Sequence, residues 1–290
     1  MRGWWQDLTD LVLPTECGGC GRPRAVLCER CRAALSGSPP RPVRPDPEPP
    51  GLPVVHASAP YADEVRAALL AHKERGALAL ARPLGEALAG AVRAALRARR
   101  RQQAPRVAGR LAAGVLLVPV PSSGRAVRAR GHDAGRRIAL AAAGVLRRDG
   151  LPARVAPVLR QRPGVADQAG LTAAQRLANL TGALTVAPGG ERLLLGAGPV
   201  VLVDDVMTTG ASLAEAARAA RTALYRAAQD VRKRSSNSAP AFVYRGGRRE
   251  RRGEQPHRAA QERVSRRMVD EQVCAAVVAA SPDAFELNRN

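Results

Sequence analysis

Short apolar runs alternate with longer amphipathic segments along the middle of this 290-residue chain. The runs Val115–Val120 and Val200–Val203 are apolar throughout, as are strands that lie buried on both faces of a parallel sheet. A similar run, Val273–Ala280, lies near the end of the chain. Apolar residues recur at helical spacing between the runs, and we expect helices over Asp63–Leu70, Leu78–Arg99, Arg136–Arg148 and Ser212–Ala223. This alternation predicts an α/β fold with a mostly parallel sheet flanked by helices.

The remaining segments divide the chain into parts. Residues 1–35 carry four of the five cysteines, and the Pro-rich residues 36–53 are interpreted as a linker, since proline ends helices and central strands. The α/β domain is expected over 54–221 and 273–290. Residues 222–272 are rich in arginine and lack a clear period, so we expect loop or disorder there. This connection of about fifty residues is far longer than the usual ~2–6. It indicates either a basic insertion or a disturbed reading frame.

Composition and charge add two expectations. Aromatic residues make up only 2% of the chain, so Ala, Val and Leu must fill the core. The formal net charge of +21 favours polyanionic partners, although coding bias towards arginine is an alternative explanation. No run approaches the ~20 apolar residues of a membrane span, and Met1–Asp10 lacks the features of a secretion signal. We therefore expect a cytoplasmic protein.

The cysteines of the first part form the pattern C-x2-C-x7-C-x2-C, with Cys17, Cys20, Cys28 and Cys31. Two such pairs can supply four thiolates to one tetrahedral ion, and in a reducing cytoplasm the pattern predicts Zn²⁺. Unligated thiols or redox pairs are the alternative. A closed four-cysteine site would be structural, and the module either completes a small fold or presents arginines to a nucleic acid, namely Arg22, Arg24, Arg30 and Arg32. Cys274 is expected in the core.

Two adjacent carboxylates follow the apolar run that begins at Val200. Asp204 and Asp205 precede a loop with hydroxyl side chains and a glycine, and a helix is expected next; the loop and helix start contain Thr208, Thr209, Gly210 and Ser212. Ligands of open α/β sheets bind at the carboxyl ends of strands, and the N–H groups at a helix start favour phosphate. Adjacent carboxylates repel each other unless sugar hydroxyls or a cation share them. The segment therefore predicts a phosphate and ribose site, with an ordinary strand end and an Asp helix cap as the alternative.

The segment VVLVDDVMTTGAS resembles the phosphoribosyl pyrophosphate motif of type I phosphoribosyltransferases. The resemblance implies a parallel sheet with flanking helices and a mobile hood. It also implies that Asp204 and Asp205 contact the ribose hydroxyls, that Thr208–Ser212 surround the 5′-phosphate, and that Mg²⁺ accompanies the pyrophosphate.

Further motifs resemble those of the ComF family of competence-associated proteins over roughly residues 10–221 and 273–290. Besides the cysteine module, they comprise Tyr61…Arg66…His72-Lys73, Val118–Ser123, Arg128–Asp133, Leu159-Arg160 and Gln168…Leu171…Arg176…Asn179. The resemblance implies that Pro121 and Ser122 hold pyrophosphate and that Lys73, Arg128 and Arg130 neutralise its charge. His132 is either a polar loop residue or has a chemical role.

Three functions are compatible with these patterns. The first is Mg²⁺-dependent transfer of a phosphoribosyl group to an unknown acceptor, by positioning and charge neutralisation. The second, implied by the ComF resemblance, is a non-catalytic nucleotide-binding protein of DNA uptake that partners single-stranded DNA and a competence helicase. The scarcity of aromatic residues for base stacking weakens the case for single-stranded DNA. The third, a purely structural zinc protein, does not account for Asp204 and Asp205.

Overall fold

The computed structural model describes residues 16–102, 114–162, 182–237 and 269–288 of the chain. Its main feature is a six-stranded sheet with the order β1-β2-β8-β7-β3-β4. Five strands run parallel, and β1 pairs antiparallel with β2 at one edge. The strands are β1 (Arg41–Val43), β2 (Val55–Pro60), β3 (Val115–Pro119), β4 (Ala153–Val155), β7 (Val200–Met207) and β8 (Val273–Ala280). The expected α/β fold with a mostly parallel sheet is confirmed.

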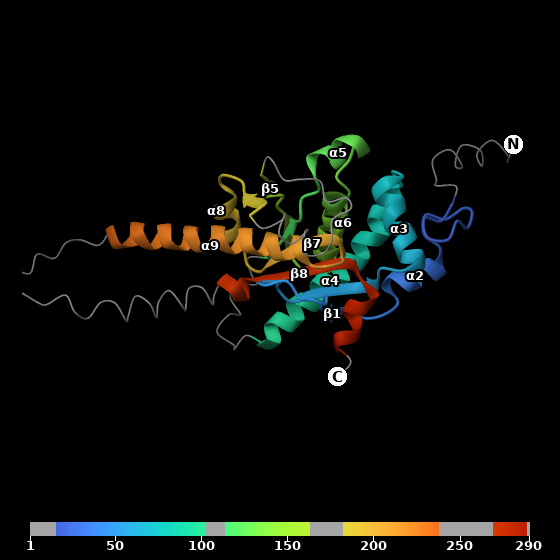
Figure 1. Ribbon diagram of the computed structural model, residues 1–290, viewed down its shortest axis with the longest axis horizontal. Helices are drawn as coiled ribbons and strands as arrows, with labels where there is room; N and C mark the ends of the chain where they lie inside the picture. The colour runs from blue at the N-terminus through green and yellow to red at the C-terminus, as the bar shows by residue number, and fades with distance from the viewer. Residues whose placement is uncertain (1–15, 103–113, 163–181, 238–268, 289–290) are drawn as a thin grey trace, which may run out of the picture.

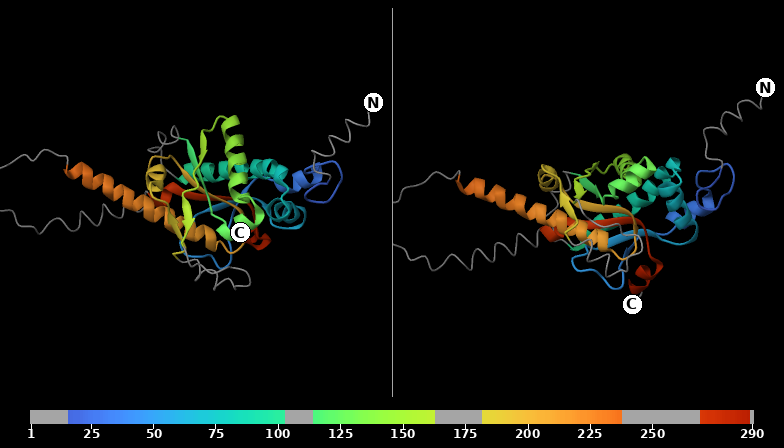
Figure 2. Two further views of the ribbon diagram at one scale, coloured as in Figure 1. Left: turned by 90° about the horizontal axis from the view of Figure 1, so that it is seen from above. Right: turned by 45° about the horizontal axis from the view of Figure 1, so that its top comes forward.

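Helices cover both faces of this sheet, which makes a three-layer molecule (Figures 1 and 2). One face carries α2 (Glu29–Ser36), α3 (Asp63–Glu74), the turn η1 (Leu78–Leu80), α4 (Ala81–Gln102) and α6 (Ala134–Arg148). The other carries α8 (Gly190–Leu195), α9 (Ala211–Asn237) and a small sheet of β5 (Leu159–Gln161) and β6 (Leu184–Val186). Helix α5 (Gly124–Arg130) follows β3, and η3 (Pro282–Asn288) packs against β1. Side chains of β7 alternate between the two faces, as the pleat requires.

Small aliphatic side chains fill the core. Among the described residues, Phe285 is the one buried aromatic side chain. Helices α4 and α6 pack closely instead of being separated by large side chains. A Cβ at Gly85 of α4 would lie 2.5 Å from the Cβ of Ala141 in α6. Ser58 of β2 donates a hydrogen bond of 2.7 Å to the Ala87 carbonyl and so joins the sheet to α4. These close approaches allow a core of Ala, Val and Leu to reach the density of a protein interior.

Most expected elements are present, with some different ends. The strands expected over Val115–Val120 and Val273–Ala280 are confirmed, and helices form in all four expected places. The helix expected over 63–70 continues to Glu74. The strand expected over 200–203 continues to Met207, because Asp204 and the residues after it still pair with β8. Strand β2 was not predicted, since His56 and Ser58 interrupt its apolar pattern.

The structure corrects both segments that we expected to be irregular. The linker prediction is wrong for residues 41–43, which pair with β2 as β1. The prediction of loop or disorder over 222–272 is wrong for residues 269–272, which are helical, and for residues 222–237, which extend α9. Leu224 and Ala227 are buried there and continue the apolar stripe of the helix. Helix α9 extends beyond the edge of the sheet in all three views (Figures 1 and 2). Residues 238–268 lie outside the described residues, so the choice between an insertion and a disturbed frame is untested.

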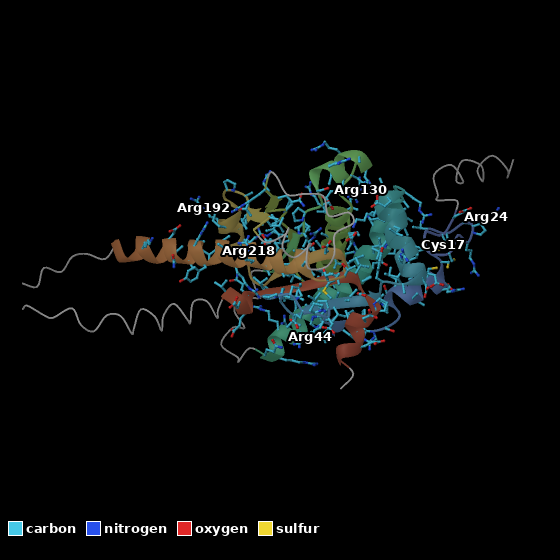
Figure 3. The ribbon with its side chains drawn as sticks, viewed as in Figure 1. Cys17, Arg24, Arg44, Arg130, Arg192 and Arg218 are labelled. Carbon is cyan, nitrogen blue, oxygen red and sulfur yellow. The ribbon has the colours of Figure 1, made fainter. Side chains whose placement is uncertain are left out.

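The basic side chains are distributed around the molecule. Arg24, Arg44 and Arg192 lie on different sides of the body (Figure 3). In the described part of the chain, no helix is at once long enough and apolar enough to cross a membrane.

Candidate functional site

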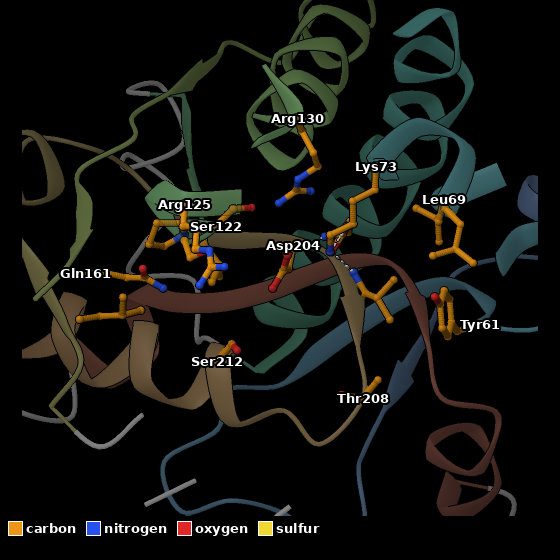
Figure 4. Close-up of a pocket in the computed structure, with 17 residues that line it drawn as sticks. Tyr61, Leu69, Lys73, Ser122, Arg125, Arg130, Gln161, Asp204, Thr208 and Ser212 are labelled. Carbon is orange, nitrogen blue, oxygen red and sulfur yellow. Dashed lines mark hydrogen bonds and ion pairs between the residues drawn. The ribbon is translucent and has the colours of Figure 1, made fainter. Parts of the chain in front are cut away.

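A cleft of about 600 Å³ opens at the carboxyl ends of β3 and β7. Its walls come from α3, the loop between β3 and α5, α5 itself, the small sheet of β5 and β6, and the start of α9 (Figure 4). In open α/β sheets this end of the strands is where ligands bind. The cleft also contains the two carboxylates that the sequence singled out.

Asp204 and Asp205 form the floor of the cleft. The Asp205 side chain is 8% exposed, and its Oδ2 lies 2.8 Å from Nζ of Lys73, whose side chain is 35% exposed. Burial and the neighbouring Asp205 carboxylate raise the pKa of Asp204 well above its usual range. Burial opposes charge on Lys73, but the Asp205 carboxylate outweighs it and raises the pKa of the ammonium group. The Lys73 charge is therefore already shared with Asp205, and Asp204 is the carboxyl that a sugar hydroxyl or a cation would relieve.

Arg130 supplies a second cation on the same side. Its side chain, only 10% exposed, extends from α5 towards Asp204 and Lys73 (Figure 4). Its Nε donates to the Ala126 carbonyl at 3.0 Å, while Nη1 is buried without a hydrogen-bond partner and lies 3.8 Å from a Glu74 oxygen. Burying a guanidinium without partners for all its donors is costly, so this group is suited to receive an anion.

Hydroxyl groups line the remaining walls. Ser122 lies on the loop after β3, and Thr208 and Ser212 lie around the start of α9. Ser123 caps α5 by accepting a hydrogen bond of 3.2 Å from the Ala126 N–H, which fixes the loop against the helix. The N-terminus of α9 adds the positive end of a helix dipole.

The cleft contains most of the predicted residues, but not all of them. Among the described residues, the lining includes the predicted Lys73, Pro121, Ser122, Arg130, Asp204, Asp205, Thr208 and Ser212. Arg128 is exposed on α5 and is not among the lining residues, so its place beside the pyrophosphate stays a prediction. Thr209 and Gly210 also lie outside the lining. Gly210 instead shapes the loop with a φ of +72°.

Several lining residues were missed or lie outside the described residues. Arg125 and Gln161 line the cleft, and neither was assigned a role from the sequence. Arg125 directly follows the predicted Val118–Ser123 loop and its glycine, which was a usable signal, whereas Gln161 lies on a strand too short to predict. The motif positions Gln168, Leu171, Arg176 and Asn179 lie outside the described residues.

The four cysteines of the N-terminal pattern gather into one cluster. Their Sγ atoms all lie within 4.8 Å of one another, and those of Cys20 and Cys28 are 3.6 Å apart. These separations fit four thiolates around one ion with bonds of ~2.3 Å. The backbone N–H of Cys28 donates to Sγ of Cys17 at 3.3 Å, and a Cβ at Gly19 would lie 2.7 Å from Sγ of Cys31. Because Gly19 has no Cβ, the second pair of cysteines can approach the first pair this closely.

This cluster is packed onto the α/β domain. Leu27 and Leu35 of the module are buried in the same core as α3 and α4. Arg30 forms an ion pair with Glu64 of α3, and Arg32 forms one of 2.8 Å with Glu86 of α4. Two of the four arginines considered for nucleic-acid contact are therefore engaged with the domain, which favours the structural role of the module.

A second hollow of about 560 Å³ lies near the starts of β2 and β8. Burial, together with the nearby Arg97, lowers the pKa of its His56 to about 4. Arg221 is paired with Asp270 at 2.9 Å, and Nε of Arg99 donates to the Glu271 carbonyl at 2.6 Å. These cations are engaged with protein groups, so the hollow is less suited to an anion than the first cleft.

The first cleft therefore combines features that suit a phosphorylated sugar. Cationic groups lie beside two carboxylates, and hydroxyl donors surround a helix start. Such a site can bind anionic oxygens with its cations and vicinal hydroxyls with its carboxylates. No protein-family model and no curated protein matches this chain.

Proposed function

We propose that the chain is a ComF-like protein of the type I phosphoribosyltransferase class that binds phosphoribosyl pyrophosphate or a nucleotide in the first cleft. The observation that carries the proposal is the meeting of Lys73, Arg130 and Asp204-Asp205 at the carboxyl ends of β3 and β7. A ligand with both phosphates and vicinal hydroxyls satisfies these opposite charges together, whereas a simple anion would leave the carboxylates unrelieved.

The residues of the cleft divide into three roles in this proposal. Asp204 and Asp205 would accept hydrogen bonds from the ribose hydroxyls. Thr208 and Ser212 would donate to the 5′-phosphate at the start of α9, where the helix dipole adds to the attraction. Pro121 and Ser122 would lie against the pyrophosphate, with Arg130 as its nearest buried cation and Arg125 at the rim.

Transfer from such a complex needs no protein nucleophile. A lone pair on the acceptor attacks the anomeric carbon, the bond from that carbon to the pyrophosphate oxygen breaks, and the pyrophosphate leaves with the bonding electrons. The acceptor then loses its proton to solvent or to a base that we do not assign. Mg²⁺ would enter with the pyrophosphate and share its charge. The residues of the cleft contribute by positioning the two partners and by neutralising the leaving group.

The cysteine cluster belongs to the same proposal as a structural Zn²⁺ site. All four positions of a tetrahedral ion would be filled by sulfur, so no position is open for a substrate. The ion would hold residues 17–31 together, and the Arg30 and Arg32 ion pairs would then fix this segment on α3 and α4.

Calorimetric titration with phosphoribosyl pyrophosphate and Mg²⁺ tests the function. The test variant is Asp204→Asn/Asp205→Asn, which keeps the shape of the floor and removes its charge. The control is Asp230→Asn, an exposed aspartate of α9 far along the helix from the cleft. We expect binding by the wild type and the control, and a loss of at least about tenfold in the test variant, which corresponds to ~1.4 kcal/mol. A folded, zinc-loaded wild type that binds neither phosphoribosyl pyrophosphate nor a nucleotide would refute the proposal.

A turnover assay distinguishes a transferase from a non-catalytic nucleotide-binding protein. Release of pyrophosphate in the presence of nucleobases would identify a transferase and its acceptor. Tight binding without release would instead favour the non-catalytic nucleotide-binding protein, the form that the ComF resemblance connects with DNA uptake.

A further inference from the structure

His132 connects the two helices that carry Lys73 and Arg130, the cations beside the carboxylates of the cleft. It lies in the three-residue turn between α5 and α6, after Gly131, which ends α5 with a φ of +72°. Asp133 follows and caps α6 by accepting a hydrogen bond of 2.9 Å from the Arg136 N–H. The helix end on one side and the cap on the other leave the His132 backbone little freedom.

Both ring nitrogens of His132 face backbone carbonyl oxygens. Nδ1 lies 3.0 Å from the carbonyl oxygen of Arg130, at the end of α5. Nε2 lies 3.2 Å from the carbonyl oxygen of His72, near the end of α3. A neutral imidazole has one N–H and can donate to only one of these oxygens, whereas an imidazolium donates to both. Both carbonyls also belong to the last turns of helices, where the helix dipole favours a cation.

The neighbouring histidine does not share this arrangement. The His72 ring lies edge-on to that of His132, with 5.9 Å between their centroids. Its Nδ1 is 3.2 Å from the Ala77 carbonyl, and its buried Nε2 has no hydrogen-bond partner. Burial lowers the pKa of His72, so this ring stays neutral and serves as an apolar wall for His132. The charged groups nearest to these two histidines along the chain are Lys73 and Glu74 at the end of α3, Arg130 at the end of α5, Asp133 in the turn, and Arg136 and Arg137 in α6.

The two carbonyl groups that His132 contacts belong to, or directly precede, the cations Arg130 and Lys73. The His72 carbonyl directly precedes Lys73, and the Arg130 carbonyl belongs to Arg130 itself. We propose that His132 is a positioning residue of the cleft, which bridges α3 to the α5–α6 turn and so fixes Lys73 and Arg130 together. The choice of ligand in this inference rests on the proposed function, whereas the bridge itself does not.

Two substitutions separate the bridge from general packing. His132→Phe keeps a flat ring against His72 and removes both donors, whereas His132→Gln keeps a donor that does not titrate. We expect His132→Phe to weaken binding of phosphoribosyl pyrophosphate about tenfold and His132→Gln to recover part of this loss, since a side chain that donates a hydrogen bond to one of the two carbonyls restores part of the bridge. Arg137→Gln, an exposed cation on the first turn of α6, is the control for loss of charge.

Hydrogen exchange of the ligand-free protein tests the bridge without any ligand. We expect faster exchange in His132→Phe over residues 73–77 and 131–133 together, and in neither segment for Arg137→Gln. Wild-type exchange and wild-type ligand affinity in folded His132→Phe and His132→Gln would overturn the inference. If the exchange changes while no ligand binds the wild type, the bridge is upheld and the proposed function fails. If ligands bind and neither variant changes affinity or exchange, the function is upheld and the bridge fails.

Discussion

The contact between Glu215 and Arg218 offers the sharpest test of how the far wall of the cleft is held. Arg218 donates to both carboxylate oxygens of Glu215 at 2.6 and 2.7 Å, and to the Leu184 carbonyl at 2.9 Å. The Leu184 N–H in turn donates to Glu215 at 2.9 Å. These hydrogen bonds fasten β6 to α9, and Leu184 is itself part of the cleft lining. The substitution Arg218→Met keeps an unbranched apolar stem and removes the guanidinium that makes these three hydrogen bonds.

The size of the effect follows from the exposure of the two partners. The Glu215 side chain is 4% exposed, whereas that of Arg218 is 43% exposed. Removing one partner of a fully buried pair costs ~3–5 kcal/mol, and solvent around Arg218 reduces this, so we expect a loss of about 2 kcal/mol in the free energy of unfolding. For a domain of this size that corresponds to a fall of about 4–8 °C in the midpoint of thermal unfolding.

Thermal unfolding followed by circular dichroism measures this difference. The matched control is Arg226→Met, the same replacement at an exposed arginine of the same helix, for which we expect a change within about 0.5 kcal/mol. The double variant Glu215→Leu/Arg218→Met should be less destabilised than Arg218→Met alone, because it leaves no buried carboxylate without a partner. Equal midpoints for Arg218→Met and Arg226→Met would refute this account of the wall.

The Glu215–Arg218 pair also predicts how the stability of the protein changes with pH. Burial would raise the pKa of Glu215, but hydrogen bonds from Arg218 and from backbone N–H groups outweigh it and lower the pKa below its ordinary value of 4.5. Because the folded-state pKa is the lower one, the stabilisation is complete above pH 4.5 and is lost as the pH falls through the folded-state value. The difference between the wild type and Arg218→Met should therefore shrink in acid.

Two glycine substitutions test the metal module and the phosphate loop. Gly19→Ala places a Cβ 2.7 Å from Sγ of Cys31, so we expect reduced zinc content by atomic absorption. The control is Gly144→Ala in α6, where the new Cβ would make only an ordinary contact of 3.6 Å, and it should keep full zinc content. Gly210→Ala puts a side chain at a φ of +72° and 3.1 Å from Leu52, so we expect about 1–2 kcal/mol of lost stability and weaker binding of phosphoribosyl pyrophosphate. Gly150→Ala, at a φ of +78° with no atom within 4 Å, should show the backbone strain alone and normal binding.

The carboxylate floor of the cleft could be predicted because its residues are adjacent in the chain. An apolar strand followed by Asp204-Asp205 and a hydroxyl loop is a local pattern, and the sheet then fixes where that pattern lies. The cations are a different case, since Lys73 and Arg130 come from separate helices and meet only in the folded chain. Their inclusion depended on the family resemblance. That resemblance could not show which arginines of α5 face the cleft, because the Ser123 cap and the Gly131 turn set the orientation of this helix.

The ends of elements were the least predictable part of the fold. Composition alone assigned residues 222–237 to an irregular segment, because Arg and polar residues outnumber apolar ones. Leu224 and Ala227 are buried and keep this part of α9 on the domain, and the helix continues beyond them because a helix that is already formed extends at little cost. Strand β7 likewise extends beyond its apolar run. Pairing with β8 satisfies the backbone hydrogen-bonding groups there, whatever the side chain of Asp204.

The Pro-rich segment was interpreted as a linker, yet its contacts give it a part in the site. Leu52 and Pro45 pack against Gly210, at the loop that leads into α9. Arg221 of α9 donates a hydrogen bond of 2.6 Å to the Gly51 carbonyl, which fastens the segment further along the same helix. Proline has no N–H to satisfy and holds its own φ, so the part of the segment after β1 can lie against this loop without a ladder of hydrogen bonds. The segment between the cysteine cluster and β2 therefore forms the back wall of the loop that we propose for the 5′-phosphate.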